Sequence, residues 1–247
     1  MMNHNGATPS LVNVLISGNH TSYVGGGMYN QDSSPTLVNV TIASNADSFN
    51  NVGGLHNSYS FPTLVNCIVW GNQGNQIRND SSSSPTITYS IVQGGYPGTG
   101  NQDADPLFVQ QLSYSLAPTS AGNYRLSYGS PAIDSGDNTP VTFITDLDYK
   151  PRIVQPTVDR GAYEWQDYSL TVNIVGEGEV TAAPDWPAFT FLDEVELTAT
   201  PEAGWVFTGW TGDVISSENP LTLTITEDTV ITATFITFQI YLPLVVQ

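Results

Sequence analysis

The sequence predicts an all-β protein, in which a right-handed parallel β-helix of about four coils and its C-terminal cap precede a small β-rich repeat domain. Three observations lead to this fold class. A proline-headed phrase recurs four times, a glycine-led phrase recurs between its copies, and runs alternating apolar and polar residues follow residue 168. The prolines are Pro9, Pro35, Pro62 and Pro85, at steps of 26, 27 and 23 residues. A period in the twenties is typical of a solenoid, whose turns bury their apolar faces against one another.

Residues 1–100 carry the proline-headed repeats. The apolar runs are about seven residues long and rich in β-branched side chains, which favours strands over helices. Apolar residues at equivalent places in successive coils are expected to stack as inward ladders, with strands about 4.8 Å apart. The predicted ladders are Leu11, Leu37, Leu64 and Ile87; Ile16, Ile42, Val69 and Val92; and Val14, Val40, Cys67 and Ser90.

Asparagine and glycine mark the corners of each coil. Asn13, Asn39 and Asn66 recur where the alternation changes from even to odd positions, so we expect a corner there with side-chain amides bonded along a ladder. The phrase that begins at Gly26 returns at Gly53, and it predicts a second strand in each coil behind a glycine turn.

The first residues resemble the middle of a coil. Aligning the repeats places Met2 opposite Met28, and the start of the chain has neither a basic stretch nor an apolar run. The expectation is therefore a C-terminal part of a longer protein, with its export signal upstream.

Residues 101–167 are rich in turn-forming residues and contain several ordered blocks. These blocks are Ala104–Val109, Tyr124–Ser127, Gly129–Asp137, Asp146–Asp148, Pro151–Arg152 and Val158–Glu164. Together they resemble the C-terminal region of the bacterial choice-of-anchor Q family. The resemblance implies a cap on the end of an exported β-helix and no chemistry. Tyr149 departs from the pattern, since the family usually has glycine after Asp-Leu-Asp.

Residues 168–235 contain four alternating runs, which predict half-buried strands. The runs are 170–175, 195–200, 221–226 and 230–235. The phrase Gly-Trp-Val-Phe-Thr-Gly-Trp-Thr-Gly-Asp at 204–213 and the closing Thr-Ala-Thr-Phe resemble the divergent internalin-type B-repeat family. This resemblance implies a small β domain of secreted or surface proteins that serves as a spacer or adhesion module. Residues 236–247 form an apolar tail too short to span a bilayer.

The charge of the chain limits its partners and its surroundings. With 23 acidic and 5 basic side chains, the net charge is −18, which argues against nucleic acid and anionic membrane surfaces. One cysteine excludes an intramolecular disulfide. The expected location is extracellular or on the cell surface, and the expected partners are extracellular glycans or cell-envelope components, with no membrane span. The oligomeric state is not specified by these patterns.

Many parallel β-helices degrade polysaccharides, so catalysis needs to be considered. Glycoside hydrolysis requires two carboxylates on one face, and a lyase requires a basic residue to take the proton. Residues 1–100 contain Asp32, Asp47 and Asp80, no glutamate, and Arg78 as their one Lys or Arg. The sequence therefore predicts that the chain is not an enzyme, with neither a catalytic residue nor a cofactor.

Metal sites and reactive groups have alternative interpretations. Five aspartates of the second segment have two interpretations: Asp134, Asp137, Asp146, Asp148 and Asp159. They could gather around a calcium ion, since this ion is bound by several carboxylate and carbonyl oxygens. We favour the alternative that they initiate turns by bonding the backbone, with Arg152 or Arg160 as ion-pair partners. No metal site is predicted. The scattered histidines, His4, His20 and His56, are expected in surface turns. Cys67 is expected to be a buried apolar group.

Three aromatic residues of the third segment have two interpretations. In a regular strand Trp205 and Phe207 lie on one side and Trp210 on the other, so core packing is favoured over a sugar-stacking face.

The predicted function is that of a non-catalytic, exported surface or extracellular protein with a structural, adhesive or envelope-attachment role. Two alternatives remain: the non-catalytic C-terminal portion of a polysaccharide-degrading β-helix enzyme, and a carbohydrate-binding module. The functional part of this prediction rests on fold-level analogy.

Overall fold

The computed structural model describes residues 1–237, which form two compact units. The solenoid unit is Met1–Trp165, and the sandwich unit begins at Gln166. The described residues contain strands and turns, with one short 3₁₀ helix, η1 (Tyr114–Leu116), and no α-helix. No helix in the described part of the chain is long and apolar enough to cross a membrane.

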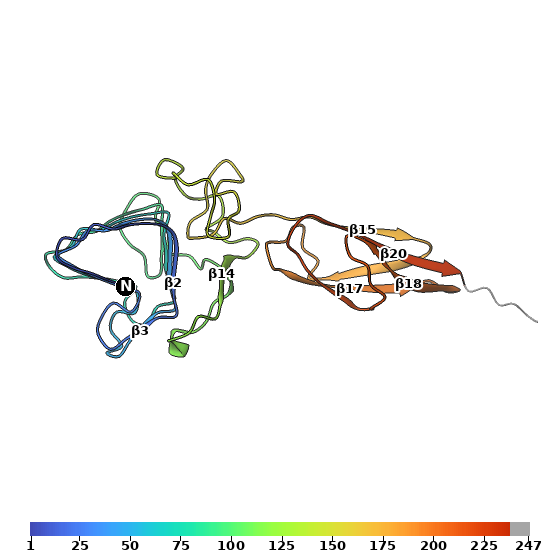
Figure 1. The fold of residues 1–247 in the computed structure, drawn as a ribbon, viewed down its shortest axis with the longest axis horizontal. Coiled ribbons are helices and arrows are strands. Elements are labelled where there is room, and N and C mark those ends of the chain that lie inside the picture. The colour runs from blue at the N-terminus through green and yellow to red at the C-terminus, as the bar shows by residue number, and fades with distance from the viewer. Residues whose placement is uncertain (238–247) are drawn as a thin grey trace, which may run out of the picture. The chain divides into compact units, whose positions relative to one another are not determined.

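The solenoid unit winds in parallel coils that superpose in the view of Figure 1, from blue to cyan. One sheet has the order β1-β4-β7-β10, and a second has the order β11-β8-β5-β9-β12 with β2 beside β5. Four strands in the first sheet correspond to about three complete turns, where the sequence predicted about four coils. The strands are β1 (Met2–Asn3), β2 (Ser10–Ser17), β3 (His20–Thr21), β4 (Met28–Gln31), β5 (Thr36–Ala43), β6 (Ala46–Asp47), β7 (Leu55–Ser58), β8 (Thr63–Val65), β9 (Ile68–Trp70), β10 (Ile77–Asn79), β11 (Thr86–Thr88) and β12 (Ile91–Val92).

The strand register confirms the two long apolar ladders. Leu37 pairs with Leu11 on one side and with Leu64 on the other, and Leu64 pairs with Ile87. The ladder through Ile42 pairs in the same way, and the residues of both ladders are buried in one core. Side chains at one place in every coil therefore pack on their own counterparts, so the core is built by repetition.

The predicted asparagine corner is also confirmed. Asn13, Asn39 and Asn66 have φ of 53°, 54° and 55°, the left-handed region that asparagine tolerates better than most residues. The Asn39 amide nitrogen donates to the side-chain oxygen of Asn13 at 3.2 Å. Asn66 leaves this ladder, because its side chain bonds the main chain of Asp137 through its amide nitrogen (2.8 Å) and its oxygen (2.7 Å).

A buried asparagine ladder on the first sheet corrects the expected register of the first coil. In this ladder the side-chain amide nitrogen of one asparagine donates to the side-chain oxygen of the asparagine in the next coil. The bonds run from Asn3 to Asn30 (2.7 Å), from Asn30 to Asn57 (2.9 Å) and from Asn57 to Asn79 (2.8 Å). Because Asn3 lies opposite Asn30, Met2 pairs with Tyr29, so the expected alignment of Met2 with Met28 is wrong by one residue.

Residues 96–165 close one end of the solenoid and then cover its side. At the end, the Val92 amide donates to the Gln102 carbonyl and the Gln102 amide to the Ser90 carbonyl, at 3.0 and 2.9 Å. Beyond residue 103 the chain, with β13 (Phe108–Gln110) and β14 (Asn123–Leu126), lies beside the wall labelled β2 in Figure 1. A second apolar cluster joins the outer side of that wall to this cover: Ile68, Ile91, Leu126 and Ala132, with Trp70, Phe108, Ile133 and Trp165 against it.

The cover also bonds the wall through polar groups. The Thr41 hydroxyl oxygen accepts from the Ala162 amide at 3.0 Å, and the Ser44 hydroxyl donates to the Leu112 carbonyl at 2.6 Å. Gly161, at φ 96°, allows this approach, because a Cβ there would lie 2.7 Å from the Thr41 hydroxyl oxygen. The outer face of the second sheet is therefore largely occupied by the protein itself.

Tyr149, the departure from the choice-of-anchor pattern, lies in a left-handed turn with φ 63° and is 86% exposed. A residue with a Cβ is destabilised by about 1–2 kcal/mol in this conformation. Glycine avoids this strain, but it loses more conformational entropy on folding, so the net gain in stability is smaller. We expect Tyr149→Gly to raise the free energy of unfolding of the solenoid unit by about 0.5–1 kcal/mol in urea titrations. Tyr149→Ala keeps the Cβ and should give no gain. Equal stability of the two variants would contradict this assignment of strain.

The described part of the sandwich unit, residues 166–237, forms two three-stranded sheets around one apolar core. One sheet has the order β15-β20-β18 and the other β16-β17-β19, with β15 parallel to β20. The strands are β15 (Leu170–Val175), β16 (Gly178–Ala183), β17 (Glu194–Pro201), β18 (Trp205–Gly212), β19 (Leu221–Thr224) and β20 (Thr229–Thr237). Strands lie in all four predicted runs, and β20 extends to Thr237. The predicted tail therefore begins inside a strand, and its residues 238–247 lie outside the described part of the chain.

A bulge in β18 corrects the predicted orientation of Trp210. The pairing of β18 with β20 shifts register between Phe207 and Gly209, and Gly209 has φ 144°. The extra residue turns Trp210 to the same side as Phe207. Its ring lies 5.1 Å from that of Phe207, and Trp210 is 1% exposed, which confirms the core-packing interpretation.

Candidate functional site

Two of the three aspartates of the coils, Asp47 and Asp80, have carboxylate partners within the protein. Asp47 is buried, and its carboxylate accepts from the amides of Phe49, Asn51 and Val52 at 2.9, 3.0 and 2.6 Å, which shapes the loop after β6. Asp32 is an exposed turn residue with φ 51°. The third, Asp80, lies 3.3 Å from the His56 ring nitrogen Nε2, and hydrogen bonds from His56 and Ser58 hold the pKa of its carboxyl below the usual range.

His56 is not in a surface turn, as predicted for all three histidines, but in strand β7, where it is 7% exposed. The repeat explains this, because His56 occupies the place of Tyr29 in the previous coil and of Arg78 in the next. The rings of Tyr29 and His56 lie 5.2 Å apart. His4 and His20 are exposed, as expected, although His20 belongs to the two-residue strand β3.

Cys67 is fully buried in the core, as predicted. Its thiol donates to the Val65 carbonyl at 3.3 Å, and burial raises its pKa to about 12. Since the thiolate is the reactive form, this side chain packs and does not act as a nucleophile.

The aspartates of the cover bond the backbone. Asp146 accepts from the amides of Asp148, Lys150 and Glu164 at 2.9, 3.0 and 2.9 Å. Asp159 accepts from the amides of Asp134 and Trp165, and Asp137 from that of Thr139. Asp148 forms an ion pair with Arg125, a partner that the sequence did not indicate. Within residues 1–237, no three Asp, Glu, His or Cys side chains are arranged to hold a metal ion.

A buried group of charges fastens the cover internally. Arg152 is 1% exposed, donates to the carbonyls of Asp159 and Gly161 at 2.8 and 2.9 Å, and lies 3.9 Å from the Glu164 carboxylate. Burial raises the pKa of Asp159 to about 7 and that of Glu164 to about 8. Arg160 was a predicted ion-pair partner of the cover aspartates, but its guanidinium donates two hydrogen bonds to the Ser135 carbonyl.

These raised pKa values predict how stability depends on pH. In the unfolded chain such carboxyls titrate near pH 4, so between about pH 4 and 8 the folded protein binds more protons. Stability then falls as pH rises through this window. We expect the free energy of unfolding of the solenoid unit to decrease by at least about 1.4 kcal/mol between pH 5 and 8.5, measured by urea titration at constant ionic strength. Glu164→Gln should flatten the profile, and a wild-type stability that rises over this range would contradict the assignment.

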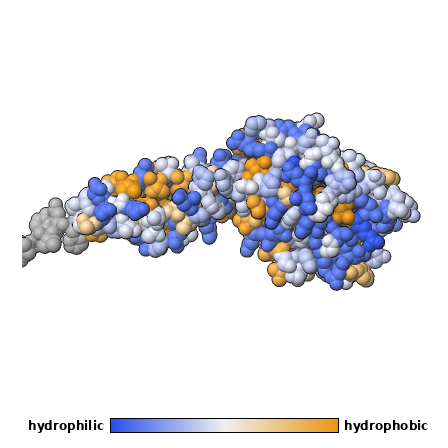
Figure 2. All heavy atoms as spheres, turned by 180° about the vertical axis from the view of Figure 1, so that it is seen from behind, coloured by the Kyte–Doolittle hydropathy of each residue, from blue (hydrophilic) through white to orange (hydrophobic). Residues whose placement is uncertain are grey.

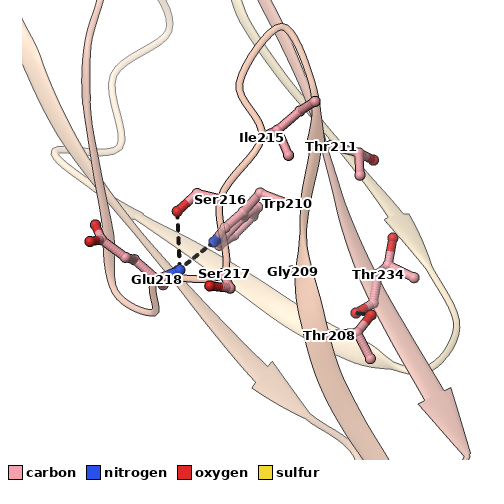
Figure 3. A pocket seen from close by; sticks show the side chains of 9 residues that line it. All are labelled: Thr208, Gly209, Trp210, Thr211, Ile215, Ser216, Ser217, Glu218 and Thr234. Atoms are coloured by element: carbon pink, nitrogen blue, oxygen red, sulfur yellow. Dashed lines mark hydrogen bonds between the residues drawn. The ribbon is translucent and has the colours of Figure 1, made fainter.

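Two open clefts lie among the described residues of the sandwich unit. The first, of about 680 Å³, lies between β18 and the loop after it, and Figure 3 shows the hydroxyl side chains that line it. The Trp210 indole belongs to its wall, because its N–H donates to the Glu218 carbonyl at 2.8 Å. Trp210 therefore offers no free face for stacking on a sugar, while Ile215 is 84% exposed.

The second cleft, of about 480 Å³, lies between the edge strands β15 and β16 and the loop that contains Trp186. Trp186 is 40% exposed, and Glu179 and Asp185 also line the cleft. Sequence reasoning missed Trp186, because it belongs to a loop with no periodic pattern. In the face shown in Figure 2, hydrophobic residues (orange) gather on the sandwich unit, whereas the solenoid unit is largely hydrophilic.

Comparison with known families finds a similarity in one segment of the chain. Residues 168–238 match the family model of the divergent InlB B-repeat domain. No curated protein and no solved structure matches the chain. The resemblance of residues 101–167 to the choice-of-anchor Q family stays a prediction.

Proposed function

We propose that this protein is exported and acts, without catalysis, in surface display, adhesion or attachment to the cell envelope. The observation that carries the proposal is the match of residues 168–238 to a repeat domain typical of bacterial surface proteins. A short solenoid that precedes such a repeat has the architecture of a scaffold.

The solenoid unit supports a structural role. Asp47, Asp146 and Asp159 accept main-chain N–H groups, so their lone pairs hold loops in place and are not directed at a substrate. The cover occupies the outer side of the second sheet, which removes that wall as a binding surface. On the first sheet, Tyr29, His56 and Arg78 lie along one line, where Tyr29 is half-buried, His56 is buried and Arg78 is exposed.

The second candidate is a carbohydrate-binding module, or the non-catalytic C-terminal portion of a polysaccharide-degrading enzyme. The observation that favours carbohydrate binding is the open cleft with the exposed Trp186 indole and Asp185 among its lining residues. Neither the structural role nor the carbohydrate-binding role involves cleavage of a glycan by this chain. The two roles differ in whether the chain binds a glycan.

Location and turnover test the proposal separately. Antibody labelling of intact cells that express the gene for this protein should detect the protein at the surface or in the medium. The purified chain should release no reducing ends from a panel of plant and bacterial polysaccharides. Confinement of the protein to the cell interior would contradict export, and turnover that Asp80→Asn abolishes would contradict the non-catalytic assignment.

A further inference from the structure

The cleft of the sandwich unit beside β15 and β16 has the features of a small binding site. Both strands are edge strands, one in each sheet, so the cleft opens on a side where neither sheet has a further strand among the described residues. Its volume of about 480 Å³ is within the range of small-molecule sites. The floor is apolar and is formed by Leu170, Val172, Val180, Ala182 and Phe189.

Trp186 supplies a flat apolar face at this cleft. Its ring lies 5.9 Å from that of Phe189 at an angle of 44°, so the buried Phe189 supports one part of the indole while 40% of Trp186 remains exposed. Among the described residues, the large exposed side chains include no other tryptophan. An indole held in this way suits the C–H face of a pyranose ring, because both surfaces are flat and apolar with polar edges.

The charges beside Trp186 select among sugars. Asp185 lines the same cleft, and residues 168–237 contain eleven acidic side chains and no Lys or Arg. Glu179 also borders the cleft, but its side chain alternates with the inward Val180 and points to the other face of β16. A field of one sign attracts cations and repels anions, so uronic acid polymers are disfavoured and an ammonium group is favoured. Carboxylates also accept strong hydrogen bonds from ammonium groups.

We propose that this cleft binds an amine-bearing pyranose, with the ring on Trp186 and the ammonium group at Asp185. The inference rests on the proposed extracellular function, and it names the class of glycan that the repeat domain holds. Neutral N-acetylated sugars keep the stacking surface and lose the charge, so they should bind less tightly.

Isothermal titration of the full chain tests the proposal with glucosamine tetramer, N-acetylglucosamine tetramer and an oligogalacturonate of the same length. We expect the glucosamine tetramer to bind at least tenfold more tightly than the acetylated one, and the oligogalacturonate not to bind. Trp186→Ala should weaken glucosamine binding at least tenfold, and Trp186→Phe should restore part of the loss. Asp185→Asn should remove the preference for the amine and its dependence on salt.

Ile215→Ala is the matched control, because Ile215 is more exposed than Trp186 and lines the other cleft; its binding should equal that of the wild type. Near-ultraviolet circular dichroism checks that each variant is folded. The proposal is overturned by no binding of the glucosamine tetramer, by equal binding of both tetramers, or by wild-type affinity in folded Trp186→Ala. Surface labelling of cells separates the two claims, since a surface protein that fails the titration overturns the ligand alone.

Discussion

Leu37→Ala should lower the free energy of unfolding of the solenoid unit by about 2–5 kcal/mol. Leu37 is fully buried and lies between Leu11 and Leu64 in the register of the coils. Parallel main-chain hydrogen bonds fix the spacing of the coils, so the neighbouring leucines cannot move together to fill the space. The cost therefore includes the cavity as well as the lost apolar burial. Urea titration followed by far-ultraviolet circular dichroism measures it.

Thr36→Ala is the control for this prediction, because Thr36 is the adjacent residue of β5 and its side chain is exposed. Its effect should stay within about 0.5 kcal/mol. A loss below about 1 kcal/mol for Leu37→Ala, or equal losses for the two variants, would show that Leu37 does not point into a packed interior.

Arg152→Met should destabilise the solenoid unit by about 3–5 kcal/mol at pH 8.5, since removing one partner of a buried ion pair leaves an uncompensated charge. Arg152 and Glu164 are both almost completely buried, and Asp159 lies in the same group. At pH 5 the loss should be smaller, because the raised pKa values of Asp159 and Glu164 keep these carboxyls protonated in the folded protein. Urea titrations at the two pH values measure the difference.

The double variant Arg152→Met with Glu164→Gln controls for packing. It removes the cation together with one of the charges it faces, so it should recover part of the stability lost at pH 8.5. A loss in Arg152→Met that is independent of pH and unchanged by Glu164→Gln would mean that Arg152 contributes through its carbonyl hydrogen bonds alone.

The sequence predicted the parts of the fold that repeat. Residues equivalent to Leu37, Ile42 and Asn39 recur in successive coils. Their place in the repeated phrase therefore predicted that Leu37 and Ile42 are buried and that the chain bends at Asn39. The register of the first coil was predicted wrongly by one residue, because the match of Met2 to Met28 concerned side-chain type, whereas the asparagine ladder from Asn3 sets the pairing.

The cover and the candidate site lacked such a signal. The contact between Thr41 and Ala162 joins residues 121 positions apart, and no periodicity relates them. The side of Trp210 depends on one bulge residue in β18, and Trp186 belongs to a loop whose neighbours come from β15 and β16. Contacts between segments that do not repeat required the three-dimensional structure.

Disulfide formation between engineered cysteines tests the stacking of the coils most directly. Ser10 and Thr36 are exposed residues paired on adjacent parallel strands, and Thr63 follows Thr36 one coil further on. Neighbouring strands are about 4.8 Å apart, within the span of a disulfide, whereas two steps exceed its limit of about 7 Å. Cys67 does not compete, because it is buried and its thiol pKa is about 12. Mild oxidation should cross-link Ser10→Cys with Thr36→Cys in the folded protein and leave Ser10→Cys with Thr63→Cys reduced; cross-linking of the second pair and not the first would contradict the stacked solenoid.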